Sequence, residues 1–217
     1  MVNFAFPPQE PIALPIAESD EAFPLRRIYC VGRNYAEHSR EMGHDPEREA
    51  PFFFMKPADA LVPGGGSIPY PPATKDLHHE VELVVALGPD AKVFGHAVGI
   101  DLTRRDLQGV AKKAGRPWEM GKAFDNAAPC GPLTRAGQPM TCGAIELKIN
   151  GETRQSGNIS DLIWPVEDVL RHLAGFVELK PGDLIFTGTP AGVGPIQPGD
   201  RLHAEIEGLT PLDLTVG

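Results

Sequence analysis

The chain has 217 residues, 41% of them hydrophobic, which is enough for one ordinary globular core. Its formal net charge of −9 argues against a surface for nucleic acid or anionic membranes, but a small anionic substrate stays compatible, because a metal ion and local cations can reverse the field. We see no long apolar segment, no signal peptide and no C-x-x-C pair among three cysteines, which predicts a cytoplasmic protein with free thiols.

The beginning of the chain divides into an arm and the start of a folded domain. Residues 1–24 are rich in proline and predict an irregular arm or edge strands. The main domain is then expected to occupy residues 25–217. Its first element is a short β-strand at residues 27–32, which a glycine ends.

Two segments that follow carry candidate functional side chains. Residues 33–43 predict a short helix on which His38 and Glu41 lie three residues apart. They could hydrogen-bond as a general base and its orienting carboxylate, or they could belong to a surface helix of mixed charge. An apolar run at residues 51–57 predicts a buried strand that ends near Lys56, either as a cation in a pocket or as a surface lysine.

The most informative stretch contains two glutamates that alternate with apolar residues. Glu80 and Glu82 alternate with Val81 and Leu83, the pattern of a half-buried strand, so both carboxylates share one face. Adjacent carboxylates repel each other, and a divalent cation removes the conflict; hard oxygen ligands favour Mg²⁺ or Ca²⁺, with Mn²⁺ close behind. Asp101, at the end of the next apolar run, could supply a third oxygen ligand. The alternative is a solvated edge strand with surface glutamates.

A helix is predicted to begin soon after Asp101. Thr103 and Asp106 resemble a capping box, and the apolar pattern continues for several turns. Arg105 and Gln108 share a helical face one turn from Asp101. A guanidinium there could hold a substrate carboxylate in bidentate fashion, unless the helix is simply an exposed amphipathic one.

The C-terminal half is predicted to be mainly β. Four segments have the alternation or composition of strands: residues 145–149, 183–187, 202–206 and 212–216. Asn150-Gly151 predicts a hairpin turn, and Ser160-Asp161 is expected to open a helix with Pro165 in its first turns. The loop at residues 188–195 could hold an anion through its N–H groups and threonine hydroxyls, or could be a plain turn. The resulting fold class is α+β, mainly β, with few short helices.

Five stretches, taken together and in order, resemble the fumarylacetoacetate hydrolase family, most closely its acylpyruvase and fumarylpyruvate hydrolase branch. They are Tyr29-Cys30-Val31-Gly32-Arg33-Asn34-Tyr35, His78-His79-Glu80-Val81-Glu82-Leu83, Asp101-Leu102-Thr103-Arg104-Arg105-Asp106, Gly121-Lys122-Ala123-Phe124-Asp125 and Thr187-Gly188-Thr189-Pro190-Ala191-Gly192-Val193-Gly194-Pro195. The resemblance covers nearly everything from about residue 26 onward. The connection between Glu82 and Asp101 is shorter than is usual in this branch, a departure that concerns loop geometry and substrate range.

This resemblance implies a mixed β-roll or sandwich of the family's C-terminal type, a homodimer and an active-site Mg²⁺ or Mn²⁺. It assigns the metal ligands to Glu80, Glu82 and Asp101. It places a water-activating dyad at His38 and Glu41 and a substrate-polarising lysine at Lys122. The polar substrate contacts that it implies are Arg105, Gln108 and Thr189. Arg33 and Lys56 lie in or beside the matched motifs and are further candidate cations for a small anionic substrate.

The function expected on this basis is metal-dependent hydrolysis of the carbon–carbon bond of an acylpyruvate, with fumarylpyruvate giving fumarate and pyruvate. Oxaloacetate decarboxylation and isomerisation of a related dienoate are alternatives that would use the same stabilised enolate.

Two rival classes start from other features. A non-haem metal oxygenase could use His78 and His96 with one carboxylate. A binding module that keeps only the fold is disfavoured, since it would have little reason to keep the whole set of catalytic candidates.

Overall fold

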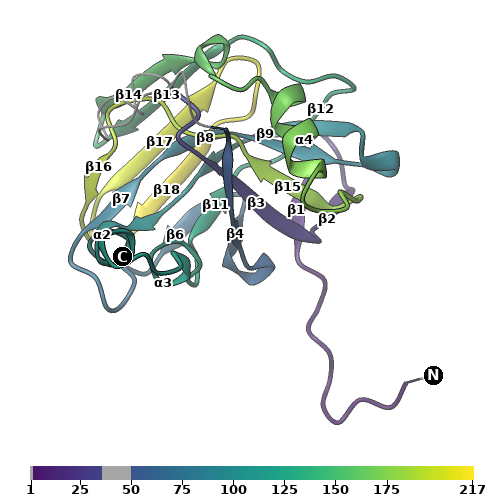
Figure 1. Cartoon of the computed structure of the whole chain (residues 1–217), viewed down its shortest axis with the longest axis horizontal. Helices are drawn as coiled ribbons and strands as arrows, with labels where there is room; N and C mark the ends of the chain where they lie inside the picture. Colours follow the sequence, from purple (N-terminus) through teal and green to yellow (C-terminus); the bar gives the residue numbers. More distant parts are fainter. Residues whose placement is uncertain (1, 36–49) are drawn as a thin grey trace.

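Two curved β-sheets pack against each other and enclose the main core of the protein (Figure 1). The computed structural model describes residues 2–35 and 50–217. The larger sheet has the order β4 (Phe52–Lys56), β3 (Arg27–Gly32), β15 (Asp183–Phe186), β8 (Val81–Leu87), β9 (Val93–Ile100), β11 (Ala128–Cys130) and β5 (Leu61–Pro63), with β12 (Thr134–Arg135) also paired to β9.

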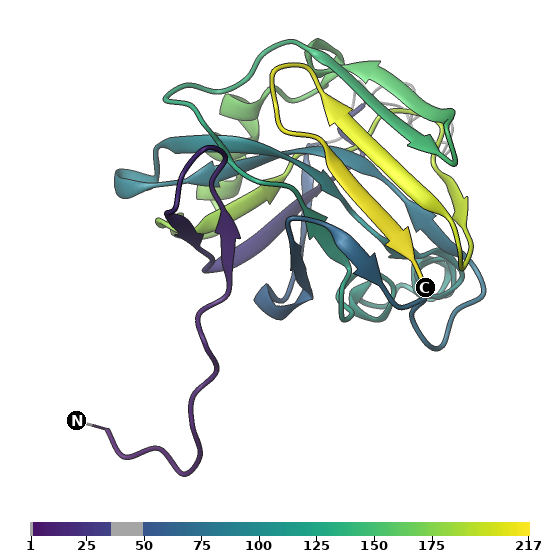
Figure 2. The ribbon, with the colours of Figure 1, turned by 180° about the vertical axis from the view of Figure 1, so that it is seen from behind.

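The second sheet of the pair has five strands and is seen from behind in Figure 2. Its order is β14 (Glu152–Asn158), β13 (Ala144–Ile149), β17 (Arg201–Ile206), β18 (Leu212–Val216) and β6 (Gly66–Ile68). Parallel pairs such as β3 with β15 occur beside antiparallel pairs such as β8 with β9. The mixed, mainly β fold expected from the sequence is therefore confirmed.

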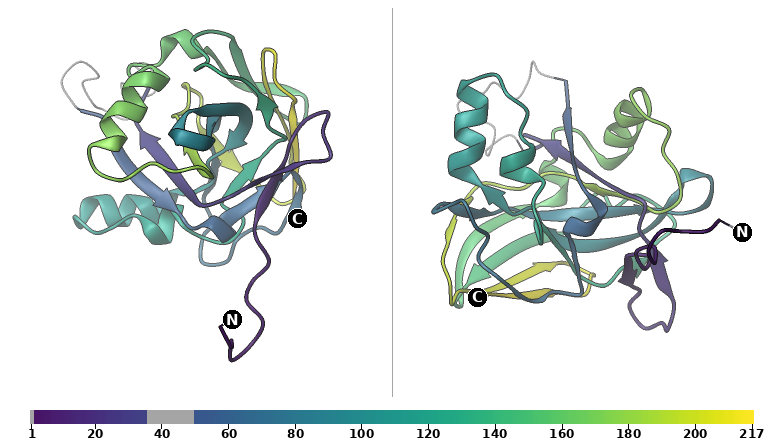
Figure 3. Two further views of the ribbon diagram at one scale, coloured as in Figure 1. Left: turned by 90° about the vertical axis from the view of Figure 1, so that its right-hand side faces the viewer. Right: turned by 90° about the horizontal axis from the view of Figure 1, so that it is seen from below.

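Two smaller sheets and a few short helices complete the described chain. One sheet is β10 (Thr103–Arg104), β7 (Leu77–His79) and β16 (Gly194–Ile196), and the other is the hairpin of β1 (Ala13–Pro15) and β2 (Ala22–Pro24). The α-helices are α2 (Arg105–Lys113), α3 (Glu119–Lys122) and α4 (Val166–Ala174), which lie outside the sheets (Figure 3). The 3₁₀ turns are η1 (Ala58–Ala60), η2 (Pro89–Ala91) and η3 (Ile159–Asp161). Within the described ranges, no helix is both long and apolar enough to cross a bilayer.

The central strand β8 is buried on both of its faces. Val81, Leu83 and Val85 enter the core between the two large sheets. On the opposite face, Val84 lies in a second apolar cluster with Leu14 of the N-terminal hairpin. The prediction of a half-buried strand here was wrong, because the hairpin of the arm covers the face that we expected to meet solvent.

The edge strand β4 also differs from its prediction. Its phenylalanines are only partly buried and Met55 is 44% exposed, whereas Lys56 is 1% exposed. An apolar run predicts burial, but among the described strands β4 has a partner on one side alone, which leaves its apolar side chains accessible. Lys56 is the residue that points inward.

Two predicted helix starts were misplaced. The helix expected from residue 160 is divided into η3 and α4, with Pro165 at the N-cap of α4. A proline disfavours helical geometry in the residue before it, so the chain cannot run helically through Trp164. Thr103 does not cap α2 either, since its hydroxyl donates to Glu80 Oε1 at 3.3 Å.

Other predictions are confirmed in detail. The turn at Asn150 and Gly151 joins β13 to β14 with φ angles of 53° and 85°, the left-handed geometry of a tight hairpin. Cys30, Cys130 and Cys142 are all free thiols. Most of the helix predicted at residues 33–43 lies outside the described residues.

The side chain of Asn34 links its own segment by hydrogen bonds to two others that are distant in sequence. Its side-chain amide donates to the carbonyl oxygens of Trp164 at 2.9 Å and Thr187 at 2.8 Å, and its Oδ1 accepts from the Trp164 N–H at 2.7 Å. The residue is fully buried. Gly188 lies against it with a φ of 103°, and a Cβ at that position would meet the Cβ of Asn34 at 2.7 Å. Asn34 therefore fixes where the loop after β15 leaves the sheet.

We expect Asn34→Ala to lower the free energy of unfolding by about 2–3 kcal/mol, because it leaves buried carbonyl and N–H groups without partners. Urea unfolding followed by circular dichroism measures the change. Asn3→Ala, in the exposed arm, is the control and should have no effect. Equal stability of the two variants would contradict the linking role of Asn34.

Candidate metal and substrate site

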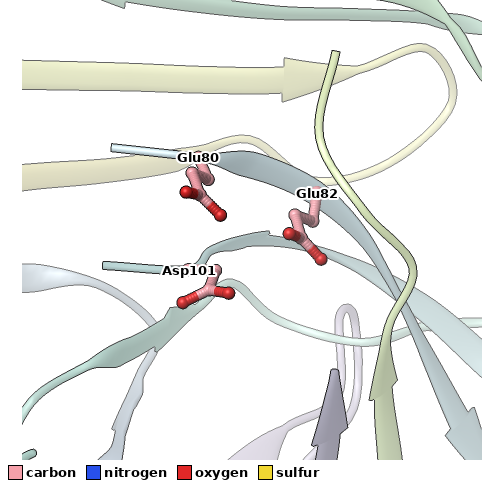
Figure 4. Close-up of side chains that lie close together, drawn as sticks. All are labelled: Glu80, Glu82 and Asp101. Atoms are coloured by element: carbon pink, nitrogen blue, oxygen red, sulfur yellow. The ribbon is translucent and has the colours of Figure 1, made fainter. Parts of the chain in front are cut away.

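The pairing of β8 with β9 brings three carboxylates onto one face. Val81 lies opposite Ile100 and Glu82 opposite Gly99. One position further, the Asp101 N–H donates to the Glu80 carbonyl at 2.8 Å, so these two residues also face each other. Directly opposed residues point to the same side of a sheet, and residues two apart do so as well. Figure 4 shows the resulting convergence of Glu80, Glu82 and Asp101.

The three side chains form a compact acidic group. One oxygen from each lies within 4.8 Å of the others, and the residues are 6%, 2% and 0% exposed in chain order. Among the described residues, this is the one group of three or more potential ligands with such spacing. Buried carboxylate oxygens are the donors that Mg²⁺, Mn²⁺ and Ca²⁺ prefer.

Cationic side chains compensate two of the three carboxylates. Lys122 Nζ lies 2.8 Å from Glu80 Oε2 and 2.7 Å from Asp101 Oδ2. Lys56 Nζ lies 2.8 Å from Asp101 Oδ1, and Arg105 pairs with Glu80. Burial lowers the pKa of Lys122, but Asp101 and Glu80 outweigh that effect and raise it overall, so the ammonium is charged.

Glu82 has no such compensation from the described residues. Its Oε2 accepts one hydrogen bond, from the Gly188 N–H at 2.8 Å, and it forms no salt bridge within the described part of the chain. Burial, followed by the charges of Asp101 and Glu80, holds the pKa of Glu82 well above its usual range. A buried carboxylate without a cation, beside two others, fits a site that takes a divalent metal ion.

A cleft opens beside the acidic group, with an empty volume of about 460 Å³. Seven of the predicted site residues line it: Arg33, Glu80, Glu82, Arg105, Gln108, Lys122 and Thr189. The lining residues that sequence reasoning missed are chiefly Phe52, Phe54, Lys112 and Trp118. The spacing of Arg105, Gln108 and Lys112 along one helical face was a signal that could have identified the lysine.

Lys56 lies outside the lining of this cleft. Besides its ion pair with Asp101, its ammonium donates to the carbonyl oxygens of Leu102 and Lys122. With these partners, Lys56 stabilises the candidate metal ligand Asp101 and fixes the backbone at Lys122. His38 and Glu41, the predicted dyad, lie outside the described residues.

The histidines of the oxygenase alternative do not join the acidic group. His78 Nε2 bonds to Asp76 Oδ1 at 2.8 Å. His96 Nε2 accepts from the Met140 N–H at 3.2 Å, and burial lowers the pKa of His96 to about 4. The potential ligands that the described structure brings together are carboxylates, which are hard donors, whereas a non-haem iron oxygenase requires two imidazoles.

A buried amide determines which way the Thr189 hydroxyl can donate. Gln155 Oε1 accepts from the Val81 N–H at 3.0 Å, and Gln155 Nε2 donates to the Pro190 carbonyl at 2.9 Å. These backbone partners fix the orientation of the amide, since an N–H only donates and a carbonyl only accepts. The other Nε2 proton goes to Thr189 Oγ1 at 2.8 Å. Thr189 must therefore use its own proton elsewhere, and Thr189 lines the cleft.

We expect Thr189→Val to raise KM for the acylpyruvates that the sequence predicts as substrates by about 10- to 100-fold, because a hydrogen bond to an anion is lost. Gln155→Leu should raise KM similarly in the wild-type background but add little to Thr189→Val. A double-mutant cycle on KM measures this coupling. Fully additive effects would show that Gln155 acts by supporting the fold and not through Thr189.

Comparisons with known proteins agree with the geometry. The family model for the fumarylacetoacetate (FAA) hydrolase C-terminal region matches residues 27–217. A fumarylpyruvate hydrolase of Ralstonia sp is 42% identical over 184 residues, which cover 80% of this chain and 96% of that protein. An oxaloacetate tautomerase of Escherichia coli (strain K12) is 40% identical over 200 residues, covering 86% of this chain and 90% of that protein.

A solved structure extends the likeness over almost the whole chain. Fumarylpyruvate hydrolase from Pseudomonas aeruginosa, in complex with Mn²⁺ and pyruvate, has a TM-score of 0.96 and 50% sequence identity over 99% of both chains. Sequence, fold and the acidic group thus lead to one conclusion: the chain belongs to the fumarylacetoacetate hydrolase family.

Proposed function

We propose that the protein is a metal-dependent hydrolase that cleaves the carbon–carbon bond of acylpyruvates, with fumarylpyruvate as the preferred substrate. The observation that carries the proposal is a buried three-carboxylate group, in which Glu82 has no cationic partner among the described residues, beside a cleft lined by cations and aromatic rings. The Ralstonia relative and the Pseudomonas aeruginosa structure, both named fumarylpyruvate hydrolase, support it.

The charges of the site favour a substrate with two carboxylates. The three carboxylates are matched in number by three cations, Lys56, Lys122 and Arg105, all of which pair with Glu80 or Asp101. A divalent cation then leaves an excess of two positive charges, which a dianionic substrate restores to neutrality. Charge neutrality matters here because the groups are buried and interact strongly in a medium of low dielectric constant.

The aromatic side of the cleft favours a flat acyl group. Phe52 and Trp118 pack edge to face with ring centroids 4.8 Å apart, and Phe54 lies 6.0 Å from the same indole. These rings are rigid apolar walls that a planar, conjugated chain can lie against. The fumaryl group of fumarylpyruvate has this shape, whereas oxaloacetate, with a single methylene between its ends, would make few contacts with these rings.

The metal ion, held by Glu80, Glu82 and Asp101, would supply Lewis-acid polarisation of the 2-oxo acid and stabilise negative charge on its enolate. Lys122 presents a charged ammonium to the same region and can donate to the enolate oxygen. Thr189 donates its hydroxyl proton to the substrate's carboxylate. We assign Mg²⁺ or Mn²⁺ as the metal, and the homodimer implied by the family resemblance stays a prediction.

The bond-breaking sequence follows from these roles. His38, kept basic by Glu41, takes a proton from water, and the resulting hydroxide adds to the ketone carbon of the acyl group. When the tetrahedral intermediate collapses, the bond between that carbon and the pyruvate methylene breaks. The electron pair passes to the pyruvate enolate, which is then protonated at its methylene carbon. Fumarate and pyruvate are the products.

Oxaloacetate conversion is the second candidate. The Escherichia coli relative is named an oxaloacetate tautomerase and is about as similar to this chain as the Ralstonia fumarylpyruvate hydrolase. Tautomerisation needs proton transfer at the methylene and stabilisation of the enolate, which the same metal ligands and Lys122 could supply without an attacking water.

A substrate panel separates the candidates. The purified protein with Mg²⁺, free of iron and under nitrogen, is assayed on fumarylpyruvate, acetylpyruvate and oxaloacetate. We measure the release of fumarate, the release of pyruvate and the loss of the oxaloacetate enol. We expect the highest kcat/KM for fumarylpyruvate, with fumarate and pyruvate formed in equal amounts. His38→Ala should lower kcat by about 10²- to 10⁴-fold.

Two results would redirect the proposal. Rapid enol loss from oxaloacetate with no cleavage of either acylpyruvate would replace hydrolysis by tautomerisation. A clear preference for acetylpyruvate would reject the dicarboxylate substrate while retaining the hydrolase.

A further inference from the structure

One face of α2 places three polar side chains along the cleft. Arg105, Gln108 and Lys112 all line it, at spacings of three and four residues. Arg105 lies beside the acidic group, through its pair with Glu80. Lys112 is seven residues further, which corresponds to roughly 10 Å along the helix axis at 1.5 Å per residue. The two cations thus lie about two helical turns apart along the cleft.

The two cations differ in what they already bind. Arg105 pairs with Glu80, and its Nη1 donates to Gln108 Oε1 at 2.7 Å. Lys112 has no ion pair or side-chain hydrogen bond with any described residue, and its ammonium lies 5.9 Å from the centre of the Trp118 ring. Arg105 is therefore largely committed to the metal site, and of these two cations of α2, Lys112 is the one available for a ligand.

The surroundings of Lys112 disfavour its charge unless an anion is present. Partial burial, together with the positive charges of Arg33 and Arg105, lowers the pKa of Lys112. Like charges gathered around one cleft are unfavourable in the free protein, and an anionic group bound between them removes the repulsion. The overall charge of −9 shows that this local excess of cations is not a general property of the chain.

We infer that Lys112 binds the carboxylate at the far end of the acyl chain and makes the cleft selective for dicarboxylic acylpyruvates. This inference rests on the proposed function and goes beyond it, because it names the residue that recognises the end of the acyl group. In the resulting arrangement, the 2-oxo acid end lies at the acidic group and the planar chain lies along Phe52 and Trp118. The distal carboxylate meets the ammonium above the indole. A substrate without that carboxylate leaves Lys112 unpaired, which gives discrimination.

The test compares two ketones that differ at one group. Fumarylpyruvate and crotonylpyruvate have the same chain length and the same double bond, with a distal carboxylate in the first and a methyl group in the second. kcat/KM is measured for both with the Mg²⁺-loaded wild type, Lys112→Met, Lys112→Arg and Lys113→Met. Lys113 is the matched control, because it is the next residue of α2 and is exposed.

We expect Lys112→Met to lower kcat/KM for fumarylpyruvate by about 10- to 100-fold and for crotonylpyruvate by less than about threefold, since only the first loses a charged hydrogen bond. Lys112→Arg should keep most of the preference, and Lys113→Met should leave both values unchanged. An equal loss on both ketones, or an equal loss from Lys113→Met, would overturn the inference.

Failure of the proposed function is a separate outcome. If the wild type cleaves neither ketone, the hydrolase proposal fails, and the same pair is titrated calorimetrically into the Mn²⁺-loaded wild type and Lys112→Met. A preference of the wild type for fumarylpyruvate that the variant loses would still support the carboxylate contact. Identical binding of the two ketones to both proteins would reject it.

Discussion

The burial of Glu82 is the constraint on which the rest of the site depends. Its carboxylate is 2% exposed, accepts one backbone N–H, and has no cationic partner among the described residues. An isolated buried charge is costly, and either a proton or a cation must remove that cost. Glu80 and Asp101 bring two further carboxylates within 4.8 Å, and a divalent cation can bind one oxygen of each at once, which a proton cannot do.

The fold holds this arrangement through ordinary sheet packing. Gly99 lies opposite Glu82, and a Cβ there would come within 2.6 Å of the Phe186 ring, so the absence of a side chain lets the sheet pack closely beneath the carboxylate. Apolar clusters on both faces of β8 keep the strand from shifting register. The balancing cations come from elements at the rim, Lys56 from β4 and Lys122 from α3. Core packing thus places the carboxylates, and the surrounding elements supply the cations that balance them.

Sequence patterns predicted the parts of this site that depend on local periodicity. Alternation put Glu80 and Glu82 on one face, and this holds in the structure. Asp101 could be proposed only as a candidate, because its place depends on the pairing of β8 with β9. The burial of the apolar side chains of β4 was mispredicted, since hydrophobicity alone does not reveal which strand is an edge. Lys112 and Gln155 were missed because their roles depend on how α2 and β14 pack against elements far away in sequence.

The most direct test of the account is a titration of the metal-free protein with Mn²⁺, with free Mn²⁺ followed by electron paramagnetic resonance. Glu82→Gln keeps the shape of the side chain and removes its charge, and Glu178→Gln, at an exposed position, is the control. We expect one Mn²⁺ per chain for the wild type and the control, and no saturable binding to a folded Glu82→Gln over the same concentrations. Wild-type binding by Glu82→Gln would contradict the claim that the three buried carboxylates hold the metal.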